Sequence, residues 1–288
     1  MIPRWFSRLL ILNIIVQSGI IVTGAVVRVT ASGLGCPTWP ECVEGSITPT
    51  DEQTETWHKY IEFGNRTLTG VLVIVAIAVF IATLKKQKSL KIRLLAAAPL
   101  LGTLAQAILG GITVLTGLNP WIVASHFLVS IVLVELSLRL WWHVHHPVVS
   151  LSGLRRWMAR GLVTVAAAVI VVGTLVTGSG PHSGDSADVG RMPFDPKVIT
   201  WLHADLVWLF IGLVVAVAVL LKSHNADRTA WKTWVLLVVV VLSQAAIGYV
   251  QHFTGLPVVL VATHVLGAVV LWNVTLITAR RLEYSEWK

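Results

Sequence analysis

Eight apolar runs, each about the 20 residues that a helix needs to cross a lipid bilayer, dominate this sequence of 288 residues. The bilayer offers no hydrogen-bond partners to the backbone, so a spanning segment is a helix or part of a closed barrel, and barrel strands need only about 10 residues. Charged residues make up 12% of the chain, about half the share found in soluble domains. We therefore predict an all-α polytopic membrane protein with eight transmembrane helices. The runs lie near residues 9–30, 64–84, 94–116, 120–141, 159–178, 199–221, 233–253 and 257–279.

Most basic residues lie in the loops on one side of the predicted bilayer. The chain has 22 Lys and Arg residues and a net charge of +8. The positive-inside rule predicts a multi-pass protein of the cell membrane with both termini in the cytoplasm and a first helix that is retained. Basic residues spread over short loops form no nucleic-acid face, so the expected partner is membrane lipid and not nucleic acid. The five basic residues on or near the outer side are Arg28, Lys59, Arg66, Arg191 and Lys197.

The chain repeats a segment of its own sequence after 138 positions. Gln106–His126 matches Gln244–His264, and the two segments share a Gln-Ala pair, a glycine, a Thr-Gly-Leu turn and a closing Val-Ala-x-His. A repeat that spans two apolar runs and the turn between them indicates repeated architecture. We therefore predict two pseudo-repeated four-helix bundles, formed by residues 1–150 and 151–288.

Each repeat ends on a histidine within an apolar run, and the same shift pairs Asn65 with His203. The corresponding pairs are His203 with His264 in the second half and Asn65 with His126 in the first. All four residues lie within about two helical turns of the outer end of their spans. Two imidazoles at equal depth on different helices suit the axial ligation of a haem iron, although imidazole also binds other metals. We predict a ligand pair at His203 and His264, and a single ligand at His126.

Polar residues near the outer end of the first half add to this site. Glu62 lies one turn before Asn65 on the same helix face, and ionisable side chains inside a membrane often mark functional sites. Arg28, near the end of the first span, either snorkels to the outer interface or faces the bundle and meets an anion. Gln106 and Gln244 are expected to form hydrogen bonds between helices.

Both cysteines of the chain, Cys36 and Cys42, flank the segment PTWPE in the first outer loop. The outer side of a cell membrane is oxidising, so a disulfide between them can persist. Such a bond is expected to be either a structural staple or a redox-active pair, because a short Pro-rich loop can strain it and make it labile. Two cysteines without a neighbouring histidine do not predict a thiolate metal site.

These features resemble the haem A synthase family of bacterial membranes, which is related to the mitochondrial enzyme. The resemblance rests on eight spans in two halves, the outer loop GLGCPTWPEC, the sequence EFGNR that begins at Glu62, and histidines in the fourth, sixth and eighth spans. It implies a membrane oxidoreductase that oxidises a ring methyl of haem O to a formyl group by successive hydroxylations, giving haem A, at an intramembrane site near the outer side. The implied partners are a haem O synthase, cytochrome c oxidase assembly and an unknown electron acceptor, and a homo-oligomer is compatible with the resemblance.

The resemblance also implies roles for individual residues. It places a haem b cofactor in the C-terminal half, with its iron on His203 and His264, and the substrate haem O in the N-terminal half, with its iron on His126. The catalytic positions map to Glu62, Cys36 and Cys42. The residues expected to contact the two haems are His203, His264, His126, Asn65, Arg28 and Arg66.

One position departs from the family pattern. Many members carry histidine three residues after the glutamate, where this chain has Asn65, so we expect His126 alone to ligate the substrate iron. His58 replaces Asn65 only if the second helix begins before its apolar run. An alternative function is that of a haem b-containing, quinone-linked electron-transfer protein of the cytochrome b kind. Complete histidine pairs in both halves would favour this alternative. A thiol-oxidising protein that acts through the cysteines is a third hypothesis, and it leaves the buried histidines unexplained.

Overall fold

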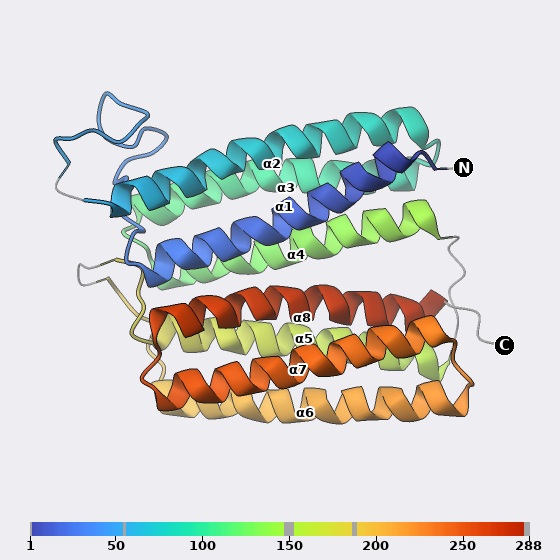
Figure 1. Cartoon of the computed structure of the whole chain (residues 1–288). Coiled ribbons are helices and arrows are strands. Elements are labelled where there is room, and N and C mark those ends of the chain that lie inside the picture. Colours follow the sequence, from blue (N-terminus) through green and yellow to red (C-terminus); the bar gives the residue numbers. More distant parts are fainter. Residues whose placement is uncertain (1, 54–55, 147–152, 186–188, 285–288) are drawn as a thin grey trace. The chain divides into compact units, whose positions relative to one another are not determined.

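The computed structural model describes residues 2–53, 56–146, 153–185 and 189–284. Eight long helices, each with the length and apolar composition of a membrane span, make up the described chain (Figure 1). They are α1 (Arg4–Val29), α2 (His58–Lys86), α3 (Leu90–Leu115), α4 (Pro120–His145), α5 (Leu154–Ser179), α6 (Pro196–Ser223), α7 (Arg228–Phe253) and α8 (Val258–Tyr284). The prediction of an all-α polytopic membrane protein with eight spans is confirmed. The cytoplasmic placement of both termini stays a prediction.

Several helices begin before the apolar runs that predict them. α2 starts at His58, about six residues early, and α6 starts at Pro196. Capping accounts for the start of α6, because the side chain of Asp195 accepts hydrogen bonds from two backbone N–H groups of the first turn, and Pro196 occupies the first helical position. The early start of α2 places Glu62 within a regular helix, so helical geometry fixes the direction of its side chain.

The repeated Thr-Gly-Leu turns share one backbone conformation. Gly117 and Leu118 have φ angles of 59° and 58°, and Gly255 and Leu256 have φ angles of 77° and 60°. A left-handed leucine costs roughly 1–2 kcal/mol, and each one is held by a bond from its own N–H to the carbonyl five residues earlier, of 2.9 Å and 2.8 Å. This bond is the signature of a Schellman motif. The sequence repeat is therefore also a structural repeat.

The first compact unit consists of Met1–His146 and Thr177–Pro193. Its four helices close into a ring in which α1 and α3 each pack against both α2 and α4. The described part of the connection between α5 and α6 packs against the loop that follows α1: the N–H of Gly33 donates to the carbonyl of Gly184 at 2.8 Å. This connection therefore belongs with the first bundle and not with the second. We call the end of the bundle that carries these loops the loop end.

The second compact unit consists of Pro147–Val176 and Phe194–Lys288. Within it α7 packs against α6 and α8, and α5 is joined to α8 by an ion pair of 3.8 Å between Arg156 and Glu283. The indole N–H of Trp234 donates to the carbonyl of Val214 at 2.8 Å, which links α7 to α6. This pairing agrees with the prediction of two four-helix halves. The assignment of a substrate side and a cofactor side to them stays a prediction.

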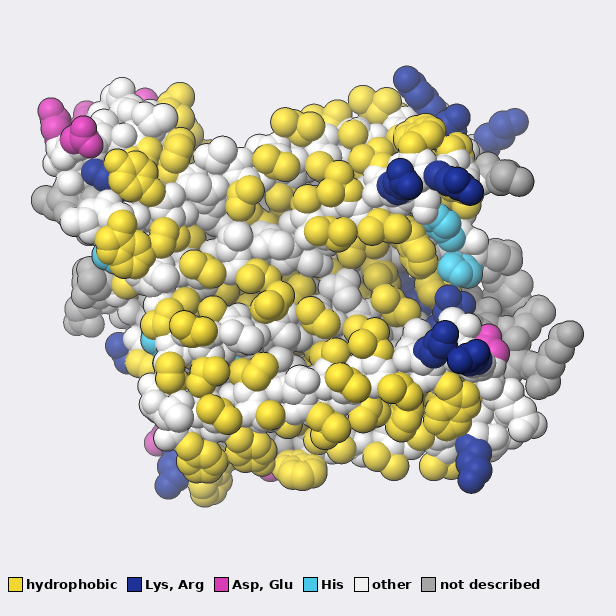
Figure 2. Space-filling view, viewed as in Figure 1, with side chains coloured by type: hydrophobic (Ala, Val, Ile, Leu, Met, Phe, Trp, Pro, Cys, Tyr) yellow, Lys and Arg dark blue, Asp and Glu magenta, His cyan; other side chains and the backbone are white. Residues whose placement is uncertain are grey.

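The outer faces of the helices carry large apolar side chains. Ile74 on α2 and Val219 on α6 are 68% and 66% exposed, and Figure 2 shows hydrophobic side chains along the helices with Lys and Arg near helix ends. Such faces are costly in water and suited to lipid, so the surface agrees with membrane insertion.

Candidate functional site

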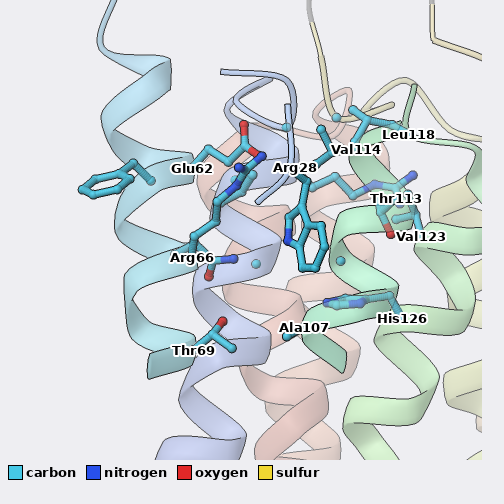
Figure 3. Close-up of a pocket in the computed structure, with 18 of the residues that line it drawn as sticks. Arg28, Glu62, Arg66, Thr69, Ala107, Thr113, Val114, Leu118, Val123 and His126 are labelled. Atoms are coloured by element: carbon cyan, nitrogen blue, oxygen red, sulfur yellow. The ribbon is translucent and has the colours of Figure 1, made fainter. Parts of the chain in front are cut away.

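A cavity of about 490 Å³ lies at the loop end of the first bundle (Figure 3). This volume is in the usual range for small-ligand sites. Residues of α1, α2, α3 and α4 line its walls, and Trp39 and Pro40 of the cysteine-containing loop and Gly184 of the α5–α6 connection also border it. The structure brings five of the predicted site residues to this one cavity. They are Arg28, Glu62, Asn65, Arg66 and His126.

His126, the seventh residue of α4, points into the cavity in Figure 3. Gly110 on α3 lies beside its ring, where a Cβ atom would come within 3.4 Å of Cε1. The backbone carbonyl of His126 accepts a hydrogen bond of 2.7 Å from the side chain of Gln106, so the predicted interhelical bond of Gln106 is confirmed. Nδ1 of His126 is buried and has no hydrogen-bond partner among the described residues, which leaves the imidazole available to a ligand.

Asn65 is the eighth residue of α2 and lines the same cavity. Its side-chain oxygen accepts a hydrogen bond of 2.7 Å from the hydroxyl of Thr23 on α1, so this position ties two helices together. The helix does begin early, at His58, but His58 stacks against Trp57 with ring centroids 4.0 Å apart and does not line the cavity. His58 therefore does not take the place of Asn65 in the cavity, an arrangement that the sequence left open.

Glu62 and Arg66 form a clamp on the cysteine-containing loop. Glu62 is only 4% exposed. One of its carboxylate oxygens accepts from the N–H of Cys36 at 2.6 Å, and the other accepts from Arg66 Nη2 at 2.6 Å and Nε at 3.1 Å. Arg66 also donates to the carbonyl oxygens of Cys36, Thr38 and Glu41. These contacts use all five N–H donors of the guanidinium, and the two charges neutralise one another.

Cys36 and Cys42 are joined by a disulfide, and both side chains are fully buried. The loop packs tightly on the start of α2, because a Cβ atom on Gly35 would lie 2.7 Å from Cα of Lys59. The expected disulfide is confirmed. The choice between a structural and a redox role stays a prediction.

The ring of Trp39 in this loop rests on Gly111 of α3, where a Cβ atom would come within 2.5 Å of the indole. A glycine is thus required for the indole to approach the helix this closely. The sequence analysis did not identify this contact, although the pair Gly110-Gly111 at the centre of the repeat was a signal for it. Trp39 and Gly111 fix the cysteine-containing loop over the cavity.

Arg28 faces the bundle and does not snorkel to the interface. Its Nε donates to the carbonyl of His182 at 2.9 Å and its Nη2 to the carbonyl of Thr177 at 3.0 Å. Thr177 belongs to the last turn of α5 and His182 to the α5–α6 connection, so Arg28 attaches the start of that connection to α1. Of the two alternatives that the sequence left open for Arg28, the structure shows the one that faces the bundle, and its meeting with an anion stays a prediction.

His203 and His264 belong to the second unit, where they are the eighth residue of α6 and the seventh of α8. Each lies beside a glycine, because a Cβ atom on Gly173 of α5 would be 3.0 Å from Cε1 of His203 and one on Gly248 of α7 would be 3.4 Å from Cε1 of His264. Nδ1 of each histidine is buried without a hydrogen-bond partner among the described residues. The structure therefore repeats at two more positions the arrangement found at His126 and Gly110.

These histidines suit a metal ion whose other ligands come from a prosthetic group and not from the protein. The described residues contain no group of three or more His, Cys, Asp or Glu side chains that could hold a metal ion. A haem iron needs only one or two axial ligands from the protein. The pair His203 and His264 and the single His126, each with a buried, unpaired Nδ1 and a glycine beside its ring, fit that requirement.

Comparison with known proteins shows similarity over most of the chain. The family model COX15-CtaA, described as cytochrome oxidase assembly protein, matches residues 7–181. A protein named Heme A synthase from Lysinibacillus sphaericus is 25% identical over 285 residues, which cover 91% of this chain and 89% of the relative. Another Heme A synthase, from Bacillus pumilus, is 25% identical over 260 residues and 82% of each chain. A third, from Geobacillus thermodenitrificans, is 33% identical over 118 residues, or 40% of this chain and 36% of the relative.

Proposed function

This chain belongs to the COX15-CtaA family of cytochrome oxidase assembly proteins, and from that premise we propose that it is a membrane oxidoreductase that converts haem O to haem A. The reaction oxidises a ring methyl to a formyl group by successive hydroxylations, within the membrane and near its outer side. The observation that carries the proposal is the cavity of the first unit, which combines a largely apolar lining with a histidine, a carboxylate and a disulfide loop.

The substrate haem O occupies this cavity, with His126 as its one histidine ligand. Support comes from the free imidazole nitrogen of His126 and from the hydrogen bond that holds Asn65 to Thr23. Glu62 borders the cavity and contacts the backbone of Cys36, so the acid and the disulfide form one connected wall. We assign the catalytic positions to Glu62, Cys36 and Cys42.

The cysteine-containing loop also shields the reacting group from water. Trp39 lies over Gly111 at the loop end of the cavity, and Arg66 binds three carbonyls of the loop. Excluding water strengthens electrostatic interactions in a site and suppresses side reactions. A fixed loop is therefore part of the site and not only a connection between α1 and α2.

A haem b cofactor is held in the second unit by His203 and His264. The unpaired Nδ1 atoms of both imidazoles and the glycines beside the rings support this assignment. When bound, haem b supplies one-electron chemistry. The protein contributes two ligands at matched helical positions, and Gly173 and Gly248 leave room for the rings to turn toward the iron.

The partners follow from the substrate and the product. A haem O synthase must supply the substrate, and assembly of cytochrome c oxidase must consume the haem A. The electrons removed from the methyl group require an electron acceptor as a further partner.

The test is to express the chain together with a haem O synthase, in a host that makes no haem A, and to identify the extracted haems by mass. We expect haem A, and no haem A from His126→Ala. Accumulation of haem O alone, with the wild-type protein inserted in the membrane and loaded with haem, would refute the proposal.

A quinone-linked cytochrome b is the second candidate, and the histidine pair of the second unit is the observation that favours it. A carrier of that kind should show two low-spin haems in a redox titration. Asn65 is held by Thr23, so we expect one low-spin haem on His203 and His264 and a different spectrum from haem at His126.

A further inference from the structure

The two arginines that line the cavity differ in how many donors they have left. Arg66 spends all five N–H groups on Glu62 and on the carbonyls of the cysteine-containing loop. Arg28 uses two of its N–H groups, one on Nε and one on Nη2, in hydrogen bonds to the protein. A guanidinium carries five N–H donors, so three of those of Arg28 have no partner among the described residues. Nη1 is wholly uncommitted there.

The charges of the two arginines are compensated differently as well. Arg66 is paired with the carboxylate of Glu62. Among the described residues no carboxylate lies within ion-pair distance of Arg28, whose acceptors are the carbonyls of Thr177 and His182. A cation in the apolar end of a membrane bundle is costly unless an anion accompanies it. Among the described residues, Arg28 is therefore a cation that lines the cavity without an ion-pair partner.

We propose that Arg28 is the carboxylate-binding residue of the substrate site, where it receives a propionate of the haem. The proposal rests on the proposed function, because it takes haem as the occupant of the cavity. Arg–carboxylate pairs are often bidentate and fix orientation as well as adding affinity. The unused N–H groups of Nη1 and Nη2 can form such a pair without breaking the bonds to Thr177 and His182.

The proposal gives the substrate two points of attachment. Figure 3 shows Arg28 nearer the loop end of the cavity than His126. A haem that is ligated by His126 and paired with Arg28 has its propionate edge directed to the loop end. Of the edges of the ring, only the propionate edge carries anions, so the pair selects one orientation of the macrocycle. Arg28 is a specificity-determining residue on this account.

The test compares binding of two probes, iron protoporphyrin IX and its dimethyl ester, to the full-length protein in detergent. Esterification removes both negative charges of the propionates and adds a methyl group to each, so the comparison with Arg28 variants is needed to isolate the effect of charge. The substrate-site signal is the part of the Soret difference spectrum that His126→Ala removes. We expect the wild type to bind the free acid about tenfold or more tightly than the ester, as the loss of a charge-assisted hydrogen bond predicts. Arg28→Gln, which keeps N–H donors for Thr177 and His182 but loses the charge, should bind both probes equally.

Arg191→Gln is the matched control. Arg191 also donates to a carbonyl of the α5–α6 connection, that of Pro181 at 3.4 Å, but it is exposed and does not line the cavity. This variant should keep the wild-type preference. Arg28→Lys, which keeps the charge, should retain part of the preference, and it replaces Arg28→Gln if that variant does not fold.

Each outcome bears on one proposal or the other. If the wild type binds both probes equally, or Arg28→Gln keeps the preference, the carboxylate site is wrong while conversion of haem O is unaffected. If the preference is found but haem O is not converted, the carboxylate site stands and the proposed function fails. If no His126-dependent binding of either probe is found, both fail.

Discussion

The carboxylate of Glu62 accepts a hydrogen bond of 2.6 Å from the backbone N–H of Cys36. This bond joins the acid of α2 to the disulfide loop, 26 residues away in sequence. Arg66 completes the junction, since it binds Glu62 and the carbonyl of Cys36 together. Glu62 therefore has a positioning role in addition to the catalytic role that we propose, and variants must separate the two.

Glu62→Gln and Glu62→Ala should have different effects on the loop. Glutamine can still accept the N–H of Cys36, whereas alanine leaves the partly buried Arg66 without its anion, a loss that costs up to about 3–5 kcal/mol for a buried pair. We expect Glu62→Ala to make the Cys36–Cys42 bond reducible by dithiothreitol at a much higher rate, as measured by alkylation and mass, and Glu62→Gln to change that rate little. Both should retain haem b and lose haem A.

Glu44→Gln is the control for removal of an acid from the same region, because Glu44 is exposed in the loop. It should behave as the wild type in both measurements. Normal haem A production by Glu62→Gln would remove the charge of Glu62 from the mechanism.

The disulfide can be removed without detaching the loop. Cys36→Ser combined with Cys42→Ser opens a ring of about seven residues, for which chain entropy predicts a loss of about 2 kcal/mol, while Arg66 still holds three loop carbonyls. We expect a folded, haem-loaded protein that makes no haem A, seen by optical spectrum and extracted-haem mass. Full activity would show that the bond is a structural staple.

The histidines of the second unit should be necessary for haem b. If both hold the haem b iron, as we propose, His203→Ala and His264→Ala are expected to abolish the reduced-state visible bands, while His126→Ala keeps them. His252→Ala is a control at the end of α7, where His252 is exposed beside Phe253. Retention of the bands in either ligand variant would contradict the assignment.

Gly173→Ala tests the space beside His203. The added Cβ would lie 3.0 Å from the imidazole Cε1, which is too close, so the ring must shift and its bond to iron must change. We expect a shifted Soret band or loss of haem b. Gly212→Ala on α6 has nothing within 4 Å of the new atom and should leave the spectrum unchanged. Equal spectra for the two variants would argue against His203 as a ligand.

Much of the fold could be predicted because the bilayer restricts the choices. Eight runs of apolar residues give eight helices, and the repeat that contains Gln106–His126 and Gln244–His264 predicted equal helical positions for the histidines. The structure bears this out, since His126 and His264 are each seventh in their helices and Asn65 and His203 each eighth. Helix starts were predicted less well, because caps and polar first turns lie outside the apolar runs.

The sequence by itself thus determined the spans, the repeat and the residue types of the site, because these depend on local composition and helical period. Only the tertiary structure decided how Glu62, Arg66 and Cys36 join, and that Arg28 binds the α5–α6 connection. Those contacts link segments between 4 and 154 residues apart. Side-chain donors can be counted from a sequence, but the acceptors that they meet depend on how the loops fold over the bundle.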